Sequence, residues 1–292
     1  MSILFVCNPI SGGSDEADRS ELVAALAPLG RVVVHEPGDR ASFADDLRSA
    51  ARDVSRVVVG AGDGTLDLTV AALIERTDEI VFGVLPMGTG NDFTRTLGLP
   101  ADPLEAAHAI AQGNELVVDT GRVLIEGETR PFINACMGGF PVAVDEAISE
   151  RQKKSLGPVA FWLGGLKAAT DLDRYRVIVN GVAHDDVVAI GIGNGRTAGG
   201  GIEVFPHADP SDGHLDICVM RADGLIEAAK LAAKVRSGDH TDEPFVSYDR
   251  AVSVEVAATP SLGFNVDGEV DGIATPARFE VGPKARFLVP AR

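Results

Sequence analysis

The chain has 292 residues, of which 45% are hydrophobic and 24% charged, and its mean hydropathy is +0.13. This composition excludes a disordered chain, and at roughly 100–200 residues per domain the length predicts two domains. The formal charge of −17 repels polyanions, so nucleic-acid binding is not expected. No uncharged run is long enough to cross a bilayer, and the first residues lack a basic signal-peptide stretch, which predicts a cytoplasmic protein.

The first part of the chain alternates short apolar runs with amphipathic segments. The runs predict strands at Ile3–Cys7, Val32–Val34, Val57–Val59 and Ile80–Leu85. Apolar residues at three- and four-residue spacing predict helices at Asp18–Leu29, Ser42–Arg52 and Leu66–Arg76. The strands are continuously apolar, as expected when both faces of a sheet are buried. This order indicates a parallel α/β domain.

After residue 118 the pattern changes to short strands separated by Gly, Asp, Asn and Pro. These predicted strands are Val117–Ile125, Pro131–Ala135, Tyr175–Val179, Val187–Ile192, Leu215–Met220, Ala251–Val256, Gly263–Val266 and Arg278–Val281. One intervening segment, Ala143–Leu172, has a helical pattern. Many short strands with turn residues between them indicate an antiparallel sandwich. The three cysteines, Cys7, Cys136 and Cys218, lie in apolar stretches and are expected to be buried thiols.

Three predicted strands of the first domain end in glycine-rich loops. The loops are 8–13 (Asn-Pro-Ile-Ser-Gly-Gly), 60–65 (Gly-Ala-Gly-Asp-Gly-Thr) and 86–92 (Pro-Met-Gly-Thr-Gly-Asn-Asp). In an open parallel sheet such loops meet at the carboxyl edge, where ligands bind. Glycine lets backbone N–H groups approach an anion, and the following helix N-termini attract negative charge. Three loops of this kind favour a nucleotide-phosphate site over tight turns alone.

The acidic residue Asp63 in the second loop limits which ligands the site is expected to bind. A carboxylate beside a phosphate needs a bridging cation, so Asp63 indicates Mg²⁺; alternatively, its side chain only caps the helix expected to begin near Leu66. The sequence lacks a GxxxxGK[ST] P-loop, a GxGxxG dinucleotide motif and the protein-kinase motifs. His207 and His214 lack zinc-ligand spacing, so a transition-metal site is not expected.

Five motifs between Asn8 and Glu269 occur in the order found in one enzyme family. They are Asn8-Pro9 with Ser11-Gly12-Gly13, Ala61-Gly62-Asp63-Gly64-Thr65, Gly88-Thr89-Gly90-Asn91-Asp92-Phe93-Thr94-Arg95, Gly193-Asn194-Gly195 with Gly199-Gly200-Gly201 and Asp212-Gly213-His214-Leu215-Asp216, and Asn265-Val266-Asp267-Gly268-Glu269. Together they resemble the diacylglycerol-kinase and sphingosine-kinase superfamily, a distant relative of the NAD kinases. Ala61 differs from the first glycine of the family's GGDGT motif, and Ser14-Asp15 stands where many relatives have a lysine.

The resemblance implies a phosphofructokinase-like parallel α/β domain over residues 1–118 and an antiparallel β-sandwich over 119–292. It further implies that the last ~10 residues return to the first domain. It also implies that ATP and Mg²⁺ are cofactors. The residues it assigns to ATP are Asn8, Pro9, Ser11, Gly12, Gly62, Asp63, Gly64, Thr65, Gly88, Thr89 and Asn91. It assigns the catalytic Mg²⁺ to an acidic network of Asp63, Asp92 and Asp119.

The same resemblance assigns the remaining carboxylates. Asp267, beside Glu269, is expected to be the general base, whereas Asp-Gly at a strand end would otherwise indicate only a hairpin turn. Asp212 is expected to bind a structural Mg²⁺ away from the chemistry, and Asp216 of the same element is a further metal candidate.

Residues 151–176 form a basic island in the acidic chain. They contain six Lys or Arg residues against two Asp, and Val159, Trp162, Leu163 and Leu166 share one helical face. Cations beside aromatic side chains are typical of a helix at a membrane surface, although such a stripe also packs on a protein core. Peripheral membrane contact and a homodimer are therefore expectations.

These observations predict an ATP- and Mg²⁺-dependent lipid kinase that phosphorylates a hydroxyl of diacylglycerol or a similar lipid. The enzyme would be cytoplasmic and transiently membrane-associated. Two alternatives remain: an NAD kinase-like enzyme, and a catalytically inactive nucleotide-binding regulatory protein.

Overall fold

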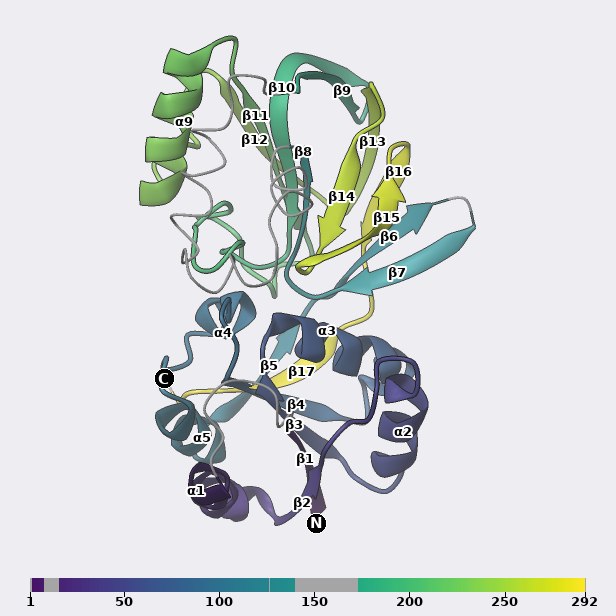
Figure 1. Ribbon diagram of the computed structural model, residues 1–292, viewed down its shortest axis with the longest axis vertical. Helices are drawn as coiled ribbons and strands as arrows, with labels where there is room; N and C mark the ends of the chain where they lie inside the picture. Colours follow the sequence, from purple (N-terminus) through teal and green to yellow (C-terminus); the bar gives the residue numbers. More distant parts are fainter. Residues whose placement is uncertain (1, 8–15, 126, 140–172, 292) are drawn as a thin grey trace. The chain divides into compact units, whose positions relative to one another are not determined.

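A computed structural model describes residues 2–7, 16–125, 127–139 and 173–291, which form two compact units (Figure 1). Unit 1 comprises Met1–Asp119 and Pro283–Arg292, and unit 2 comprises Thr120–Gly282. The chain therefore leaves unit 1 after Asp119 and returns to it at Pro283. Unit 1 has a largely parallel sheet with helices and unit 2 an antiparallel sheet, which confirms the predicted fold class.

Within the described ranges, the sheet of unit 1 has the order β2-β1-β3-β4-β17-β5. Its strands are β1 (Ser2–Cys7), β2 (Arg31–His35), β3 (Arg56–Ala61), β4 (Val81–Pro86), β5 (Asn114–Val118) and β17 (Ala285–Val289). Strands β1 to β4 are parallel, whereas β17 pairs in parallel with β4 and antiparallel with β5. The apolar residues of β1, β3 and β4 are almost entirely buried, as their unbroken apolar runs predict.

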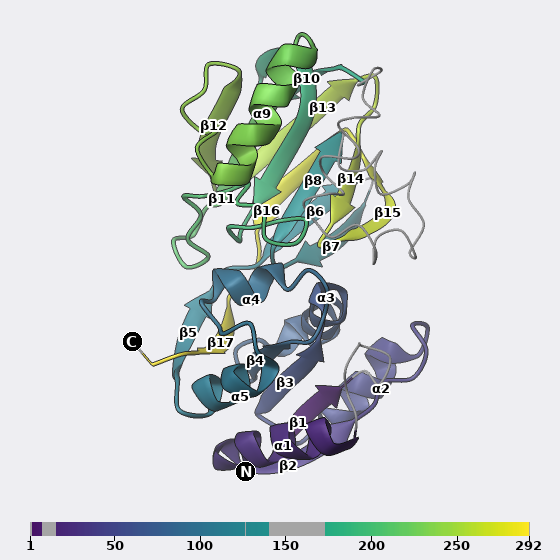
Figure 2. The ribbon, with the colours of Figure 1, turned by 60° about the vertical axis from the view of Figure 1, so that its left-hand side comes forward.

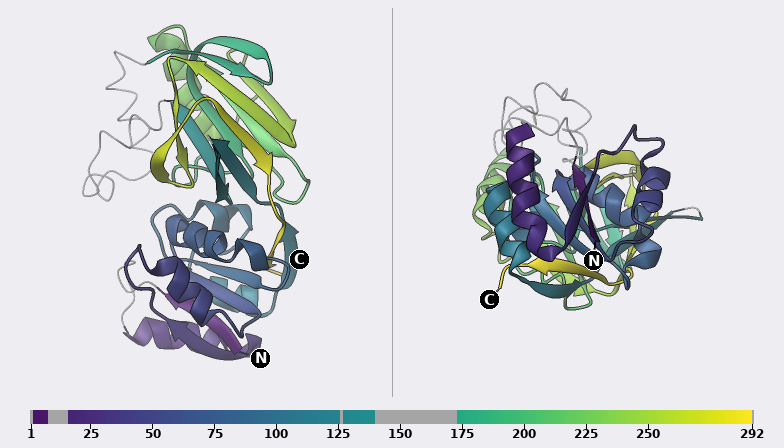
Figure 3. Two further views of the ribbon diagram at one scale, coloured as in Figure 1. Left: turned by 90° about the vertical axis from the view of Figure 1, so that its right-hand side faces the viewer. Right: turned by 90° about the horizontal axis from the view of Figure 1, so that it is seen from below.

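Helices cover both faces of this sheet, as the right-hand view of Figure 3 shows. Their bounds are α1 (Glu16–Leu26), α2 (Phe43–Ala50), α3 (Asp63–Ala72), α4 (Asp92–Thr96) and α5 (Pro103–Ala111), with 3₁₀ turns η1 (Ala27–Leu29) and η2 (Ile74–Arg76). Helix α1 contacts α5, and α2 contacts α3. The Phe93 ring of α4 lies 5.2 Å from that of Phe287 in β17, in an edge-to-face arrangement that anchors α4 on the sheet.

The strands of unit 2 form one extended antiparallel sheet in the part of the chain that is described. They are β6 (Gly121–Ile125), β7 (Glu128–Phe132), β8 (Ala135–Gly139), β9 (Tyr175–Val179), β10 (Val182–Gly193), β11 (Leu215–Arg221), β12 (Val246–Ala251), β13 (Ser253–Thr259), β14 (Gly263–Val266), β15 (Glu269–Ala274) and β16 (Ala277–Val281). Their order is β15-β14-β8-β10-β9-β13-β16-β6-β7, and β11 joins β10 to β12.

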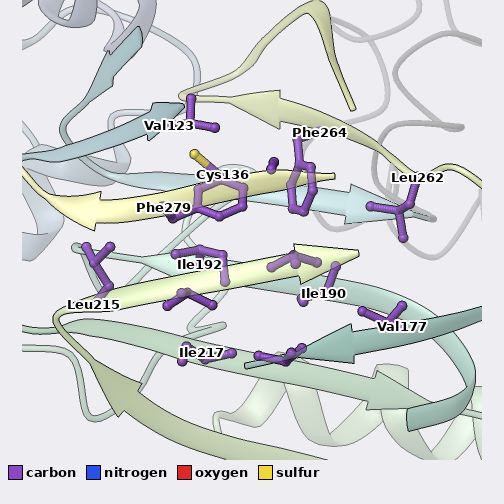
Figure 4. Close-up of a cluster of buried hydrophobic side chains, with 14 of the residues drawn as sticks. Val123, Cys136, Val177, Ile190, Ile192, Leu215, Ile217, Leu262, Phe264 and Phe279 are labelled. Carbon is purple, nitrogen blue, oxygen red and sulfur yellow. The ribbon is translucent and has the colours of Figure 1, made fainter. Parts of the chain in front are cut away.

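Unit 2 has two apolar clusters on opposite faces of this sheet. The first lies inside the curved sheet and includes Phe264, Phe279 and Ile192 (Figure 4). The second lies beneath α9 (Leu225–Ser237), which runs along the other face (Figure 2). The side chains of β11 alternate between them, because Ile217 belongs to the first cluster and Cys218 to the second.

Several predicted elements differ from the structure. The run Val117–Ile125 is two strands, because the chain changes units at Asp119 and Thr120. The run Pro131–Ala135 is also interrupted, since β7 ends at Phe132 and β8 begins at Ala135. Helices α4, α5 and α9 were not predicted. The predicted helix Ala143–Leu172 lies outside the described residues, and the three cysteines are buried, as predicted.

Candidate functional site

Two glycine-containing loops of unit 1 lie at the same edge of the sheet. The first joins β3 to α3, and the second joins β4 to α4; β3 and β4 are adjacent and parallel (Figure 1). In the second loop the Gly88 N–H donates to Asn91 Oδ1 at 2.8 Å, and Asn91 Nδ2 donates back to the Gly88 carbonyl at 2.8 Å. Asn91 adopts a left-handed conformation with φ of 54°. The side chain of Asn91 therefore closes this loop on itself.

The two loops approach each other so closely that side chains are excluded. A Cβ atom placed on Gly88 would lie 2.3 Å from the Gly62 Cα, and one placed on Gly90 would lie 2.6 Å from Asp63 Oδ2. Contacts this short cannot be accommodated without moving backbone or carboxylate. The glycines thus permit the two loops to lie in close contact. Gly62, Gly64 and Thr65 lie at the start of α3, and Gly88 and Thr89 lie before α4.

Asp63 connects the two loops. Its Oδ2 accepts a hydrogen bond from the Asp92 N–H at 3.1 Å, and its Oδ1 accepts one from the Phe93 N–H at 3.2 Å. These are the first N–H groups of α4, which have no partner within their own helix. Helix α3 begins at Asp63 itself, so the side chain caps the neighbouring helix rather than the one expected to begin near Leu66.

The carboxylates of Asp63 and Asp92 both lie close to Gly90. The Oδ2 atoms of Asp63 and Asp92 lie 2.6 Å and 3.6 Å from the position that a Gly90 Cβ would occupy, so both carboxylates border the same small space. Mg²⁺ is usually held by one or two carboxylates together with water and phosphate oxygens. The carboxylates of Asp63 and Asp92 are donors of this type. No cluster of three or more His, Cys, Asp or Glu side chains occurs among the described residues.

Asp119, the third carboxylate expected in this network, is fully buried, and its Oδ1 lies 3.3 Å from Lys284 Nζ. Both residues belong to unit 1, one from each of its two chain segments. The ammonium group of Lys284 supplies a positive charge where the resemblance implied Mg²⁺. Asp92 has a weaker charged neighbour, because Arg95 Nη1 lies 3.5 Å from its Oδ1.

A cavity of about 380 Å³ opens beside the second glycine loop. Its lining residues are Asp18, Glu21, Leu22, Pro86, Met87, Gly88, Asp102, Pro103 and Leu104. Its three carboxylates repel phosphate, so this cavity is not suited to the triphosphate itself. Carboxylates of this kind do accept hydrogen bonds from sugar hydroxyls in nucleotide sites.

In unit 2, Asp267 occupies the turn between β14 and β15 in a left-handed conformation with φ of 48°. Its Oδ2 accepts from the Ile133 N–H at 2.6 Å, and its Oδ1 accepts from the N–H groups of Asn134 and Ala135 at 3.0 and 2.8 Å. The side chain is 7% exposed. Three N–H donors favour the charged carboxylate over the protonated one. Glu269 lies two residues further along, as the first residue of β15.

The three donors to Asp267 come from a turn that the sequence pattern did not reveal. Residues 131–135 were predicted to be one strand, whereas Ile133 and Asn134 separate β7 from β8. The interaction uses main-chain atoms, so no side-chain type marks it. The signal that could have suggested a turn is the polar residue Asn134 within an apolar run.

Asp212, the expected ligand of a structural Mg²⁺, is already paired with protein groups. Its Oδ2 lies 3.0 Å from Arg250 Nη1, and its Oδ1 accepts from the His214 N–H at 2.9 Å. Asp216 points elsewhere and accepts from the Tyr248 hydroxyl at 2.6 Å. Burial raises the pKa of Asp216 above its usual value, and burial together with the Asp216 hydrogen bond raises the pKa of Tyr248. Arg250 is thus a cation beside Asp212, and the structural Mg²⁺ at this residue stays a prediction.

Some expected site residues fall outside the described ranges. They are Asn8, Pro9, Ser11 and Gly12 of the opening loop, and most of the basic island at 151–176. Two arginines of that island are described: Arg176 pairs with Asp185 at 2.9 Å, and Arg174 donates to the Asp223 carbonyl at 2.8 Å. In the described part of the chain, no helix has the length and apolar character needed to span a membrane.

Known proteins share the fold of this chain and are similar to it in sequence. Residues 2–123 match the family described as "Diacylglycerol kinase catalytic domain", and residues 135–289 match "YegS C-terminal NAD kinase beta sandwich-like domain". A diacylglycerol kinase from Bacillus anthracis str. Sterne has the same fold, with a TM-score of 0.80 and 23% identity over 99% of this chain and 96% of its own. These two matched domains define a kinase of the diacylglycerol-kinase class.

Sequence relatives identify the family within that class. A "Probable lipid kinase YegS-like" from Klebsiella pneumoniae (strain 342) is 32% identical over 88% of this chain and 86% of its own. A "Probable lipid kinase YegS" from Shigella flexneri is 33% identical over 81% of this chain and 78% of its own. The chain belongs to the YegS-like family of bacterial lipid kinases.

Proposed function

We propose that this protein is an ATP- and Mg²⁺-dependent kinase that transfers the γ-phosphoryl group to a hydroxyl of diacylglycerol or a similar lipid. The observation that carries the proposal is the placement of Asp267, a buried carboxylate whose two oxygens accept hydrogen bonds from three main-chain N–H groups. A fixed carboxylate of this kind can accept a proton from an attacking hydroxyl. Family membership supports the lipid kinase activity.

In the proposed reaction, the lipid hydroxyl oxygen forms a bond to the γ-phosphorus and the bond between that phosphorus and the β,γ-bridging oxygen breaks. ADP leaves, and the hydroxyl proton passes to Asp267. The glycine loops of unit 1 would hold the phosphates through main-chain N–H groups. Asp63 and Asp92 would hold Mg²⁺, which supplies neutralisation of phosphate charge when it is bound.

The acceptor is proposed to lie in a membrane that the protein approaches from the aqueous side. The −17 net charge opposes contact with anionic lipid, so the basic residues of segment 151–176 would provide the contact. Cytoplasmic location, transient membrane association and a homodimer belong to the same proposal. A dimer would double the number of membrane-contacting segments per particle, which strengthens a weak peripheral contact.

Transfer of label from [γ-³²P]ATP to diacylglycerol in mixed micelles tests the function. Wild-type protein with Mg²⁺ is expected to label the lipid, and Asp267→Asn is expected to lose at least 100-fold in rate. Asp78→Asn, which changes an exposed carboxylate before the first residue of β4, at the opposite end of that strand from its glycine loop, is the matched control. Label on NAD alone would establish an NAD kinase-like enzyme, and ATP binding without transfer to any acceptor would establish a regulatory protein.

A further inference from the structure

Asp267 and Asn194 bind opposite sides of the same short turn, residues 133–135. In a trans peptide unit the carbonyl and the N–H point in opposite directions. The unit that joins Ile133 to Asn134 uses both ends: its carbonyl accepts from Asn194 Nδ2 at 2.7 Å, and its N–H donates to Asp267 Oδ1 at 3.0 Å. Asn194 and Asp267 are therefore linked through one rigid planar group.

The next peptide unit repeats this arrangement. The Asn134 carbonyl accepts from the main-chain N–H groups of Asn194 and Gly195 at 2.8 and 2.9 Å. The N–H at the other end of the unit belongs to Ala135 and donates to Asp267 Oδ1 at 2.8 Å. Two consecutive peptide units thus have their carbonyls held by the segment after β10 and their N–H groups directed at one carboxylate oxygen.

These linked bonds lie in a poorly solvated environment. Asn194 is 1% exposed and Asp267 is 7% exposed. In such surroundings hydrogen bonds are stronger than in water, and a bond to the carbonyl of a peptide unit polarises its N–H group. A donor at the Ile133 carbonyl therefore strengthens the bond from the Asn134 N–H to Asp267.

We propose that Asn194 is a positioning residue, which orients and polarises the peptide units that hold the Asp267 carboxylate. The inference rests on the proposed function, because it gives Asn194 a part in preparing the general base. Asn194 touches neither the acceptor hydroxyl nor the phosphate in this proposal. Its effect on the reaction passes entirely through the turn at 133–135.

Replacing Asn194 by leucine keeps a similar side-chain volume and removes the donor to the Ile133 carbonyl. The Asn134 N–H then binds Asp267 more weakly, so the charged carboxylate loses stabilisation and takes up a proton at higher pH. The acidic limb of the kcat pH profile is expected to shift to higher pH by roughly half a pH unit to one pH unit. KM for ATP is expected to stay within twofold, because Asn194 does not bind ATP.

A second readout does not depend on catalysis. The amide signals of Asn134 and Ala135 in ¹H–¹⁵N NMR spectra report ionisation of the carboxylate that they bind. Their titration midpoint is expected to rise in Asn194→Leu by the same amount as the kinetic limb. An unchanged midpoint would overturn the proposal even if the protein is an active kinase. A wild-type protein that phosphorylates no lipid would refute the proposed function, while the NMR titration still decides the role of Asn194.

Asn134→Leu is the matched control within the same network. It removes the bond from Asn134 Nδ2 to the Thr197 carbonyl, 2.8 Å long, but leaves both peptide units bound to Asn194. Its titration midpoint is expected to match that of wild type. Equal shifts in the two variants would mean that general loosening of the loop is responsible, which contradicts the proposal. If Asn194→Leu does not fold, Asn194→Ala removes the same donor without requiring space.

Discussion

Asp63, the first residue of α3, caps α4, because its two carboxylate oxygens accept the N–H groups of Asp92 and Phe93. The negative charge lies at the positive end of the α4 dipole, which stabilises it further. The same contact brings Asp63 next to Asp92, the other proposed Mg²⁺ ligand. One side chain therefore joins the two glycine loops, holds α4 in place and assembles the acidic pair.

Replacing Asp63 by alanine is expected to affect stability as well as activity. The loss of the cap leaves two N–H groups of α4 without an acceptor and should lower the free energy of unfolding by about 1–2 kcal/mol. Urea denaturation followed by circular dichroism measures this change. Asp53→Ala, at an exposed carboxylate before β3, should change it by less than about 0.5 kcal/mol. Equal stability of Asp63→Ala and wild type would show that the cap contributes nothing.

Gly90→Ala tests whether Asp63 and Asp92 bind Mg²⁺. The added methyl group would lie 2.6 Å from Asp63 Oδ2 and must displace it. We expect the Mg²⁺ concentration for half-maximal transfer to rise roughly 10-fold, because moving one ligand weakens a site with only two carboxylates.

Gly224→Ala is the control for this substitution, since no atom lies within 4 Å of the corresponding Cβ position and the residue is in unit 2. Its Mg²⁺ dependence should equal that of wild type. The same dependence in Gly90→Ala would argue against a cation between Asp63 and Asp92.

Chelation should leave unit 2 intact, because Arg250 provides the cation beside Asp212. To exclude the Mg²⁺ site proposed for unit 1, the measurement uses the variant Asp63→Asn/Asp92→Asn, whose thermal unfolding in EDTA and in Mg²⁺ is expected to have the same midpoint. Arg250→Met should lower the stability by about 0.5–1 kcal/mol, a modest effect because the guanidinium is 54% exposed and screened by solvent. A midpoint of this double variant that falls on adding EDTA would instead indicate a structural metal in unit 2.

The sequence predicted the parts of the fold in which side chains carry the signal. Strands β1, β3 and β4 are unbroken apolar runs, and both of their faces are buried. The predicted strand Val117–Ile125 ran across the change of unit after Asp119, because apolar residues continue on both sides of that point. The return of the last ~10 residues to the first domain was implied by the family resemblance, whereas the pairing of β17 with β4 and β5 is encoded by no local pattern.

The candidate site likewise has features that residue types reveal and features that they do not. Glycines and aspartates marked the loops of unit 1, because close main-chain approach and negative charge require those residue types. Only the structure shows that Asp63 accepts the N–H groups of Asp92 and Phe93. For Asp267, the holding groups are main-chain N–H atoms of residues 133–135, which any amino acid except proline supplies. Neither those donors nor the contribution of Asn194 could therefore be inferred from the spacing of residue types.

The buried Asp216, which is hydrogen-bonded to the half-buried Tyr248, makes the stability of unit 2 dependent on pH. Burial raises the pKa of Asp216 above its ordinary value of 3.8, so the folded state favours the protonated acid more than the unfolded state does. This contribution to stability is complete below the unfolded pKa and is lost as the pH rises through the folded pKa. Unfolding free energies measured by urea from pH 3.5 upward should show the loss, and Asp216→Asn, which has no proton to lose, should flatten it.

In the same urea experiment, Tyr248→Phe separates the effect of the hydrogen bond on the pKa of Asp216 from the effect of burial. The Tyr248 hydroxyl donates to Asp216 Oδ1 and favours the charged carboxylate, so its removal should raise the pKa of Asp216 further. The fall in stability is then expected at higher pH than in wild type. A shift to lower pH would contradict the assigned direction of this hydrogen bond, and identical curves for wild type and Asp216→Asn would exclude Asp216 as the titrating group.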